Sequence, residues 1–229
     1  MMAEIDIVLF DPTQFYTSVN PYWIPVRAGI LLASQMQGVK ITYHTPSCNG
    51  EYNYSNLHTD MHNILKSILV KSPSGVVVSL SDFNSHKEIL QAIHDKGIPV
   101  IYIIAPEDFE PKALANIGSD LTREGYIAMN ELKCNEKDKV LILRNFKKGL
   151  SDMFAQRDKG IEAYLEEKGI DQNNVSELFV NVGPDSNPEQ QIINTLKKNE
   201  INTILSYNVQ VSNAYVNAIE TLSQENKPI

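Results

Sequence analysis

The chain has 229 residues, which is enough for one large domain or for two lobes of about 100 to 120 residues each. Its net charge is −8 and its acidic residues are scattered, which argues against a nucleic-acid backbone or an anionic membrane as its main partner. The two cysteines, Cys48 and Cys134, fall in different halves, and no apolar run approaches the roughly 20 residues of a transmembrane helix, so neither a disulfide framework nor a membrane span is expected.

The first part of the chain alternates apolar strands with amphipathic helices. Strands are expected over Ile5–Phe10 and Lys40–His44, and helices over Pro21–Gln37 and Tyr54–Val70. The opening residues, MMAEIDIVLF, lack the charged and apolar regions of a secretory signal. We therefore expect either a cytosolic protein or a mature segment that carries a new start codon.

The stretch from Gly75 to Ile104 predicts a βαβ unit. Two β-branched apolar runs are separated by one helix and a turn at Gly97–Pro99, as a parallel pair of strands with a right-handed crossover requires. In an open parallel sheet, ligands meet the loops that follow the carboxyl ends of the strands. Asp82, which follows the strand Val76–Leu80, is therefore placed where a ligand would bind.

The alternation resumes after an irregular segment that ends near residue 120. The elements expected there are strands over 140–145, 177–182 and 203–207, and helices over 122–133, 154–168, 188–198 and 212–222. The sequence thus predicts two βα blocks, an N-terminal lobe over 1–119 and a C-terminal lobe over 120–229, joined near Ser119 to Leu121.

Five strings in chain order resemble the type I periplasmic sugar-binding proteins, and within them the ribose-like and autoinducer-2-like receptors. The strings are NPYW from Asn20, VVVSLSD from Val76, GIPVI from Gly97, IGSDLTREG from Ile117 and RDKGIEAYL from Arg157. Each string alone is weak, but together they span almost the whole chain at ordinary spacing.

The resemblance implies an α/β fold of two doubly wound parallel-sheet lobes joined by a hinge, closing on a ligand. It implies a non-enzymatic receptor for a sugar or sugar-like polyol, without a cofactor, that serves the membrane permease of an ABC transporter or a sensor protein. Such receptors work in the periplasm or outside the cell. The alternative is the effector-sensing domain of a transcription regulator or membrane sensor kinase, which shares this fold.

Carried over residue by residue, the resemblance also implies a set of ligand-binding side chains. They are Asn20, Tyr22, Trp23, Asp82, Asp120, Arg157 and Asn208. Carboxylate, amide and guanidinium groups match the hydroxyls of a sugar, and aromatic rings supply flat apolar area with a polar handle. A buried polar group left unmatched costs about 1 to 3 kcal/mol, so such a set would be selective.

Two departures from the family pattern stand out. Many relatives carry a polar residue after the GIPV strand, where this chain has Ile104, Ala105 and Pro106. The chain also ends at Ile229, where the family continues into a further strand, an acidic loop and a last crossing back to lobe one. We therefore expect a C-terminal lobe without its last strands and final crossover.

Five of the candidates have a structural alternative. Tyr22 and Trp23 could be core residues of the first helix, and Asp82 and Asp120 are placed to cap the helices that follow them. Arg157 could pair on the surface with Asp158 or Glu162.

His58 and His62 have the spacing of metal ligands, but no third ligand lies in register on their helix, so a solvated helix flank and no metal site are expected. The nucleotide-binding and hydrolase strings GxGxxG, GxxxxGKS and GxSxG do not occur. An enzyme acting on a sugar phosphate would need a phosphate loop and a positioned acid–base pair, and neither pattern is found.

Overall fold

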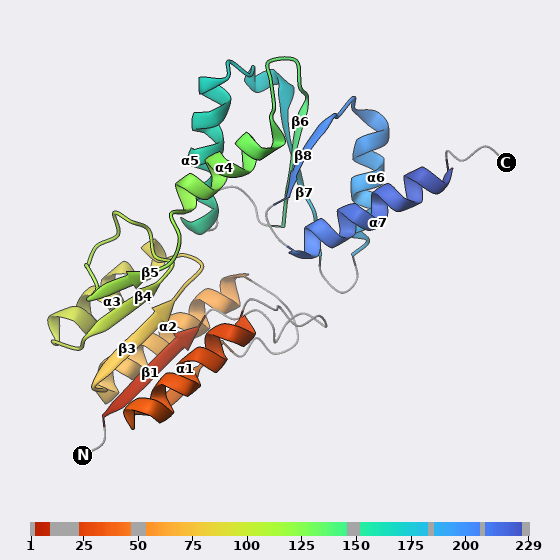
Figure 1. Cartoon of the computed structure of the whole chain (residues 1–229). Helices are drawn as coiled ribbons and strands as arrows, with labels where there is room; N and C mark the ends of the chain where they lie inside the picture. Colours follow the sequence, from red (N-terminus) through yellow and green to blue (C-terminus); the bar gives the residue numbers. More distant parts are fainter. Residues whose placement is uncertain are drawn as a thin grey trace. The chain divides into compact units, whose positions relative to one another are not determined.

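The computed structural model describes residues 3–9, 23–46, 54–145, 152–182, 186–206 and 209–225. The chain divides into two compact units, Met1–Ser119 and Asp120–Ile229, here called unit one and unit two (Figure 1). Each unit is a parallel sheet with helices on both faces.

Unit one contains a five-stranded parallel sheet in the order β2-β1-β3-β4-β5. Its strands are β1 (Glu4–Leu9), β2 (Lys40–His44), β3 (Gly75–Ser79), β4 (Val100–Ile103) and β5 (Ala115–Ile117). Its helices are α1 (Trp23–Gln37), α2 (Tyr54–Lys71) and α3 (Lys87–Asp95), with the 3-10 turn η2 (Asn84–His86) before α3. Each pair of sequential parallel strands is thus bridged by a crossover, as the sequence pattern predicts.

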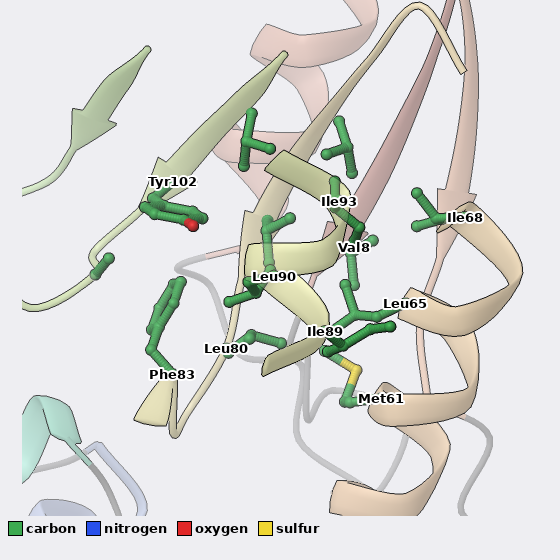
Figure 2. Packing of buried hydrophobic residues seen from close by; sticks show 14 of the residues in the cluster. Val8, Met61, Leu65, Ile68, Leu80, Phe83, Ile89, Leu90, Ile93 and Tyr102 are labelled. Atoms are coloured by element: carbon green, nitrogen blue, oxygen red, sulfur yellow. The ribbon is translucent and has the colours of Figure 1, made fainter. Parts of the chain in front are cut away.

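The two faces of this sheet have separate cores because side chains alternate along a strand. Val8 and Val78 face α2 and α3, where they pack with Leu65, Leu90 and Tyr102 in the larger cluster (Figure 2). The opposite face packs against α1 through a smaller cluster of fully buried residues, Ile7, Leu9 and Trp23.

Unit two contains a three-stranded parallel sheet in the order β7-β6-β8. Its strands are β6 (Val140–Arg144), β7 (Val175–Phe179) and β8 (Thr203–Ser206). Its helices are α4 (Leu121–Leu132), α5 (Asp152–Glu167), α6 (Pro188–Lys198) and α7 (Val209–Glu225), with the 3-10 turn η3 (Gln172–Asn174) before β7. Val140 and Ile142 pack toward α4 and α5, whereas Leu141 and Leu143 pack toward α6 and α7.

Helices α4 and α5 approach each other closely through two glycines. A Cβ added at Gly125 would lie 2.0 Å from the carbonyl oxygen of Arg157, and one at Gly160 would lie 1.8 Å from that of Thr122. Only a residue without a side chain fits at either position, so these glycines set the distance between the helices.

The predicted α/β fold with parallel sheets is confirmed, with two local differences. The sequence pattern did not identify β5 as a strand, because all three of its residues are exposed and give no apolar run. The strand predicted over 177–182 is displaced toward the N-terminus, at Val175–Phe179, where Val175 pairs with Val140. None of the helices among the described residues is long and apolar enough to span a bilayer.

Candidate functional site

Asp82 lies just beyond the carboxyl end of β3, as predicted. Its Oδ1 accepts a hydrogen bond from the backbone N–H of Ser85 at 3.0 Å, and its Oδ2 accepts one from the Ser85 hydroxyl at 2.5 Å. The carboxylate thus holds the turn η2 through Ser85, although the N-cap residues of η2 and α3 are Phe83 and His86 rather than Asp82. Its side chain keeps 18% of its surface accessible, so these bonds leave part of the carboxylate open to a ligand.

Three histidines from two elements gather beside Asp82. His86, on η2, is 4% exposed, and its ring stacks on those of His58 and His62 from α2 with centroid distances of 5.1 and 6.0 Å. The Nε2 atom of His58 lies 3.7 Å from Oδ2 of Asp82. We call His58, His62 and His86 the histidine cluster.

The histidine cluster corrects the expectation that His58 and His62 form a solvated helix flank. The pKa of His86 is lowered to about 4, mainly by burial and to a smaller extent by the neighbouring His58 and His62, while Asp82 opposes the shift. The buried ring is therefore neutral near pH 7. Among the described residues, no group of three or more His, Cys, Asp or Glu side chains is arranged to hold a metal ion.

Trp23 begins α1 and is 6% exposed, packed with Ile7 and Leu9 on the sheet. The core position considered for this side chain is therefore observed, and its contact with a ligand stays a prediction. Three of the other predicted ligand-binding residues, Asn20, Tyr22 and Asn208, lie outside the described residues.

Asp120 directly precedes α4, and Arg157, on α5, contacts the first turns of α4. Oδ1 of Asp120 accepts a hydrogen bond from the backbone N–H of Arg123 at 2.8 Å and caps the helix. Arg157 holds Glu124, one turn into the same helix, through its Nε and Nη2 atoms at 2.9 and 2.8 Å from Oε2. The partner of the guanidinium is thus Glu124 on the neighbouring helix, rather than Asp158 or Glu162 on its own.

Asp158 instead belongs to a buried charge cluster at the carboxyl end of β6. Arg144 donates from Nη1 to Oδ1 of Asp158 at 2.7 Å and from Nη2 to Oε1 of Glu177 at 2.9 Å. The side chains of Arg144 and Asp158 are each 6% exposed. This pair ties the end of β6 to α5 and β7, and sequence spacing gave no sign of it.

Asn145 is a strand-end residue that the sequence pattern placed inside a strand. It directly follows β6, as the loop with Asp82 follows β3. Its Oδ1 is buried and accepts no hydrogen bond within the described part of the chain. An amide at this position can donate to and accept from a ligand hydroxyl.

A hollow of about 260 Å³ in unit one lies away from these residues. It is lined by Ile98, Val100, Lys112 and Leu114, among others, at the amino end of β4. Ligands of parallel α/β sheets bind at the carboxyl ends, so we do not assign this hollow to the site.

Comparison with known proteins agrees with this arrangement of two parallel-sheet units. The family model described as a periplasmic binding protein domain matches residues 15–229. The chain belongs to the periplasmic binding protein family. This match confirms the resemblance read from the five sequence strings, and it places the chain in a family of binding proteins.

Solved structures of periplasmic binding proteins share the fold at low sequence identity. The XylFII-LytSN complex matches with a TM-score of 0.77 and 18% identity, covering 99% of this chain and 77% of that one. A periplasmic sugar-binding protein of an ABC sugar transporter from Legionella pneumophila matches with a TM-score of 0.72 and 19% identity, covering 97% of this chain and 77% of that one. A carbohydrate transporter solute-binding protein from Agrobacterium radiobacter in complex with D-arabinose matches with a TM-score of 0.73 and 20% identity, covering 99% of this chain and 74% of that one. No curated protein sequence shows a significant match to the chain.

Proposed function

We propose that this periplasmic binding protein is a receptor for a sugar or sugar-like polyol and serves an ABC transporter or a sensor. The observation that carries the proposal is the family match over residues 15–229, joined to a partly accessible carboxylate, Asp82, at the carboxyl end of β3. Structural neighbours from Legionella pneumophila and Agrobacterium radiobacter, described as sugar-binding and arabinose-bound, support the ligand class. We further propose that the receptor has no catalytic activity and works in the periplasm or outside the cell.

In this proposal Asp82 and Asp120 are ligand-binding carboxylates. Asp120 uses one oxygen to cap α4 and can accept from a ligand hydroxyl with the other. Both oxygens of Asp82 accept from Ser85, but each carboxylate oxygen can accept a second hydrogen bond, so Asp82 can also accept from a hydroxyl. Arg157 would donate to ligand oxygens beside its pair with Glu124, and Asn145 adds a further amide. Asn20, Tyr22, Trp23 and Asn208 complete the proposed set.

A second candidate function is effector sensing, in which ligand binding is passed to a protein partner. It is favoured by the structural similarity to XylFII, which is found in complex with another protein, LytSN. Both candidate functions require the same ligand site. They differ in whether the ligand-bound form binds a permease or a sensor.

Thermal denaturation with a panel of sugars tests whether the protein binds a sugar, as both candidate functions require. D-ribose, D-xylose, D-arabinose, D-allose, D-glucose and autoinducer-2 would be added one at a time, and at least one is expected to raise the Tm. A ligand at about 100 times its Kd adds about 2.7 kcal/mol to the free energy of unfolding, which is several degrees for a domain of this size.

Asp82→Asn separates binding from stability in the same experiment. Asparagine keeps an oxygen that accepts from the backbone N–H of Ser85 but loses the carboxylate, so the ligand shift should shrink while the Tm without ligand stays near the wild-type value. Asp95→Asn, at an exposed position of α3, is the matched control and should keep the full shift. If no sugar of the panel raises the Tm, the receptor proposal is wrong for this ligand class.

A further inference from the structure

We propose that the histidine cluster makes ligand binding at Asp82 depend on protonation, with His58 as the residue that competes with the ligand for the Asp82 carboxylate. The inference rests on the proposed function, because it takes Asp82 to be a ligand-binding residue. Its own content is that a proton taken up from solvent by the cluster weakens the binding of the ligand.

The cluster is held in place by the packing of α2 against the segment after β3. Met61 and Leu65 of α2 lie against Ile89 and Leu90 of α3, and Phe83 packs in the same core (Figure 2). His58 and His62 are one helical turn apart on α2, so both rings project toward η2, where they stack on His86. The rings therefore sit on two elements whose separation is fixed by buried apolar side chains.

The electrostatics of the cluster resist the charging of its buried member. The described titratable side chains that face His86 are His58 and His62 from α2 and Asp82 from the loop after β3. Burial is the main cause that lowers the pKa of His86 to about 4, and a charge on either neighbouring histidine would repel a second one. Among the three rings, His58 is the one that lies against the Asp82 carboxylate, with its Nε2 3.7 Å from Oδ2.

A protonated His58 competes with a ligand for Asp82. Its Nε2 lies 3.7 Å from Oδ2, so a small approach converts the contact into a charge-assisted hydrogen bond. Oδ2 already accepts from Ser85, and a second donor leaves it less available to a ligand hydroxyl. A His58 ring without the extra proton makes no charge-assisted bond of this kind, so affinity should be higher at neutral than at acidic pH.

The test is calorimetric titration of the receptor with the sugar that gives the largest thermal shift, between about pH 8 and about pH 5, the range in which histidines change charge. We expect the wild-type affinity to fall about tenfold across this range, as it would for a site coupled to one protonation by one pKa unit. His58→Gln should flatten this profile, because glutamine keeps a donor but cannot take up the proton. His94→Gln, at an exposed position of α3, is the matched control and should keep the wild-type profile.

A second measurement tests the coupling without a ligand. In NMR titration of the isotope-labelled histidine rings, His58→Gln should raise the midpoint of His86 from about 4, and Asp82→Asn should lower it, following the causes of its shift. If neither variant moves that midpoint, or if His58→Gln keeps the wild-type affinity profile, the inference is wrong. Coupling without binding of any sugar would instead overturn the proposed function and the ligand part of the inference together.

Discussion

Each unit carries an ionisable cluster beside the carboxyl end of a strand, and the two clusters differ in kind. Beside β3 in unit one, the buried member is His86, stacked between two other histidines. At the end of β6 in unit two, it is an ion pair of Arg144 with Asp158, extended to Glu177. The buried ring of the first cluster is neutral near pH 7, whereas the second cluster is made of opposite charges that compensate one another.

The two clusters therefore have different effects: the ion pair holds the end of β6 in place, whereas the histidine cluster beside β3 can change with pH. A buried arginine with two carboxylates keeps its charges over the physiological pH range, because each charge stabilises the other. The buried His86 takes up a proton only on acidification, because its pKa is lowered to about 4. We therefore expect unit two to lose stability on mutation at its cluster, and unit one to respond to pH at its own.

Removal of one partner of the buried pair should have the largest effect. Asp158→Ala leaves the Arg144 guanidinium buried without its main counter-charge, which typically costs about 3 to 5 kcal/mol. Urea unfolding followed by circular dichroism measures the loss. The double variant Arg144→Met with Asp158→Leu removes both charges and should recover most of the stability. A single variant as stable as the wild type would mean that water reaches the pair.

The helix contact of unit two should be nearly as sensitive. Gly160→Ala places a methyl group 1.8 Å from the carbonyl oxygen of Thr122, which only backbone movement can relieve, so we expect a cost of about 3 kcal/mol. Gly29→Ala is the matched control, because no atom lies within 4 Å of its added Cβ and alanine favours the helix by about 0.4 to 1 kcal/mol. Equal unfolding midpoints for the two variants would contradict the close contact of α4 with α5.

The pH dependence of unit one should reflect His86. Its pKa falls from 6.5 to about 4 on folding, so the unfolded chain binds this proton more tightly, and stability should decrease as the pH drops through that window. The effect should reach about 2 kcal/mol, since partial access of water screens the ring. His86→Phe should flatten this part of the profile.

Tryptophan fluorescence provides the measurement, because Trp23 is the single tryptophan and lies in the core of unit one. His94→Gln, at an exposed position of α3, should leave the pH dependence of stability unchanged. If the stability of the His86 variant depends on pH between about 6.5 and about 4 as that of the wild type does, His86 is not the cause of the pH dependence.

A smaller, more acidic effect is expected from Glu4 at the start of β1. Hydrogen bonds from Lys71 and then Lys40 lower the pKa of this carboxyl from 4.5 to about 2. The stabilisation is complete above the unfolded pKa and is lost as the pH falls from about 4.5 to about 2. Glu4→Gln should flatten the acid arm of the unfolding profile, and Glu107→Gln should not. If the Glu4 variant still loses stability between about pH 4.5 and about pH 2, other carboxylates are the cause of that loss.

The parallel α/β architecture could be predicted from the sequence because buried strands produce continuous apolar runs that do not depend on their neighbours. The strand β5 could not, because its three exposed residues join the sheet only through pairing with β4. β7 lies at a sheet edge, and its register follows from Val175 opposite Val140 rather than from its own pattern.

The site was predictable only in part, for a related reason. Asp82 and Asp120 could be placed because each follows a recognisable strand or precedes a recognisable helix. The histidine cluster could not, since His86 belongs to a different element from His58 and His62. For Arg157, helical spacing suggested partners on its own helix, whereas the close approach of α4 and α5 brings Glu124 to it. Side-chain partners across elements depend on tertiary packing.

The most direct test of the receptor proposal is calorimetric titration of the best sugar with one variant in each unit. Asp82→Asn and Asp120→Asn both keep an oxygen that accepts from the backbone N–H of Ser85 or Arg123, so neither should unfold its unit. Since the proposal assigns both carboxylates to ligand binding, each variant should lose about tenfold or more in affinity, the effect of about 1.4 kcal/mol from a lost hydrogen bond to a charged group. Wild-type affinity in both variants, or no binding of any sugar by the wild-type chain, would contradict the account.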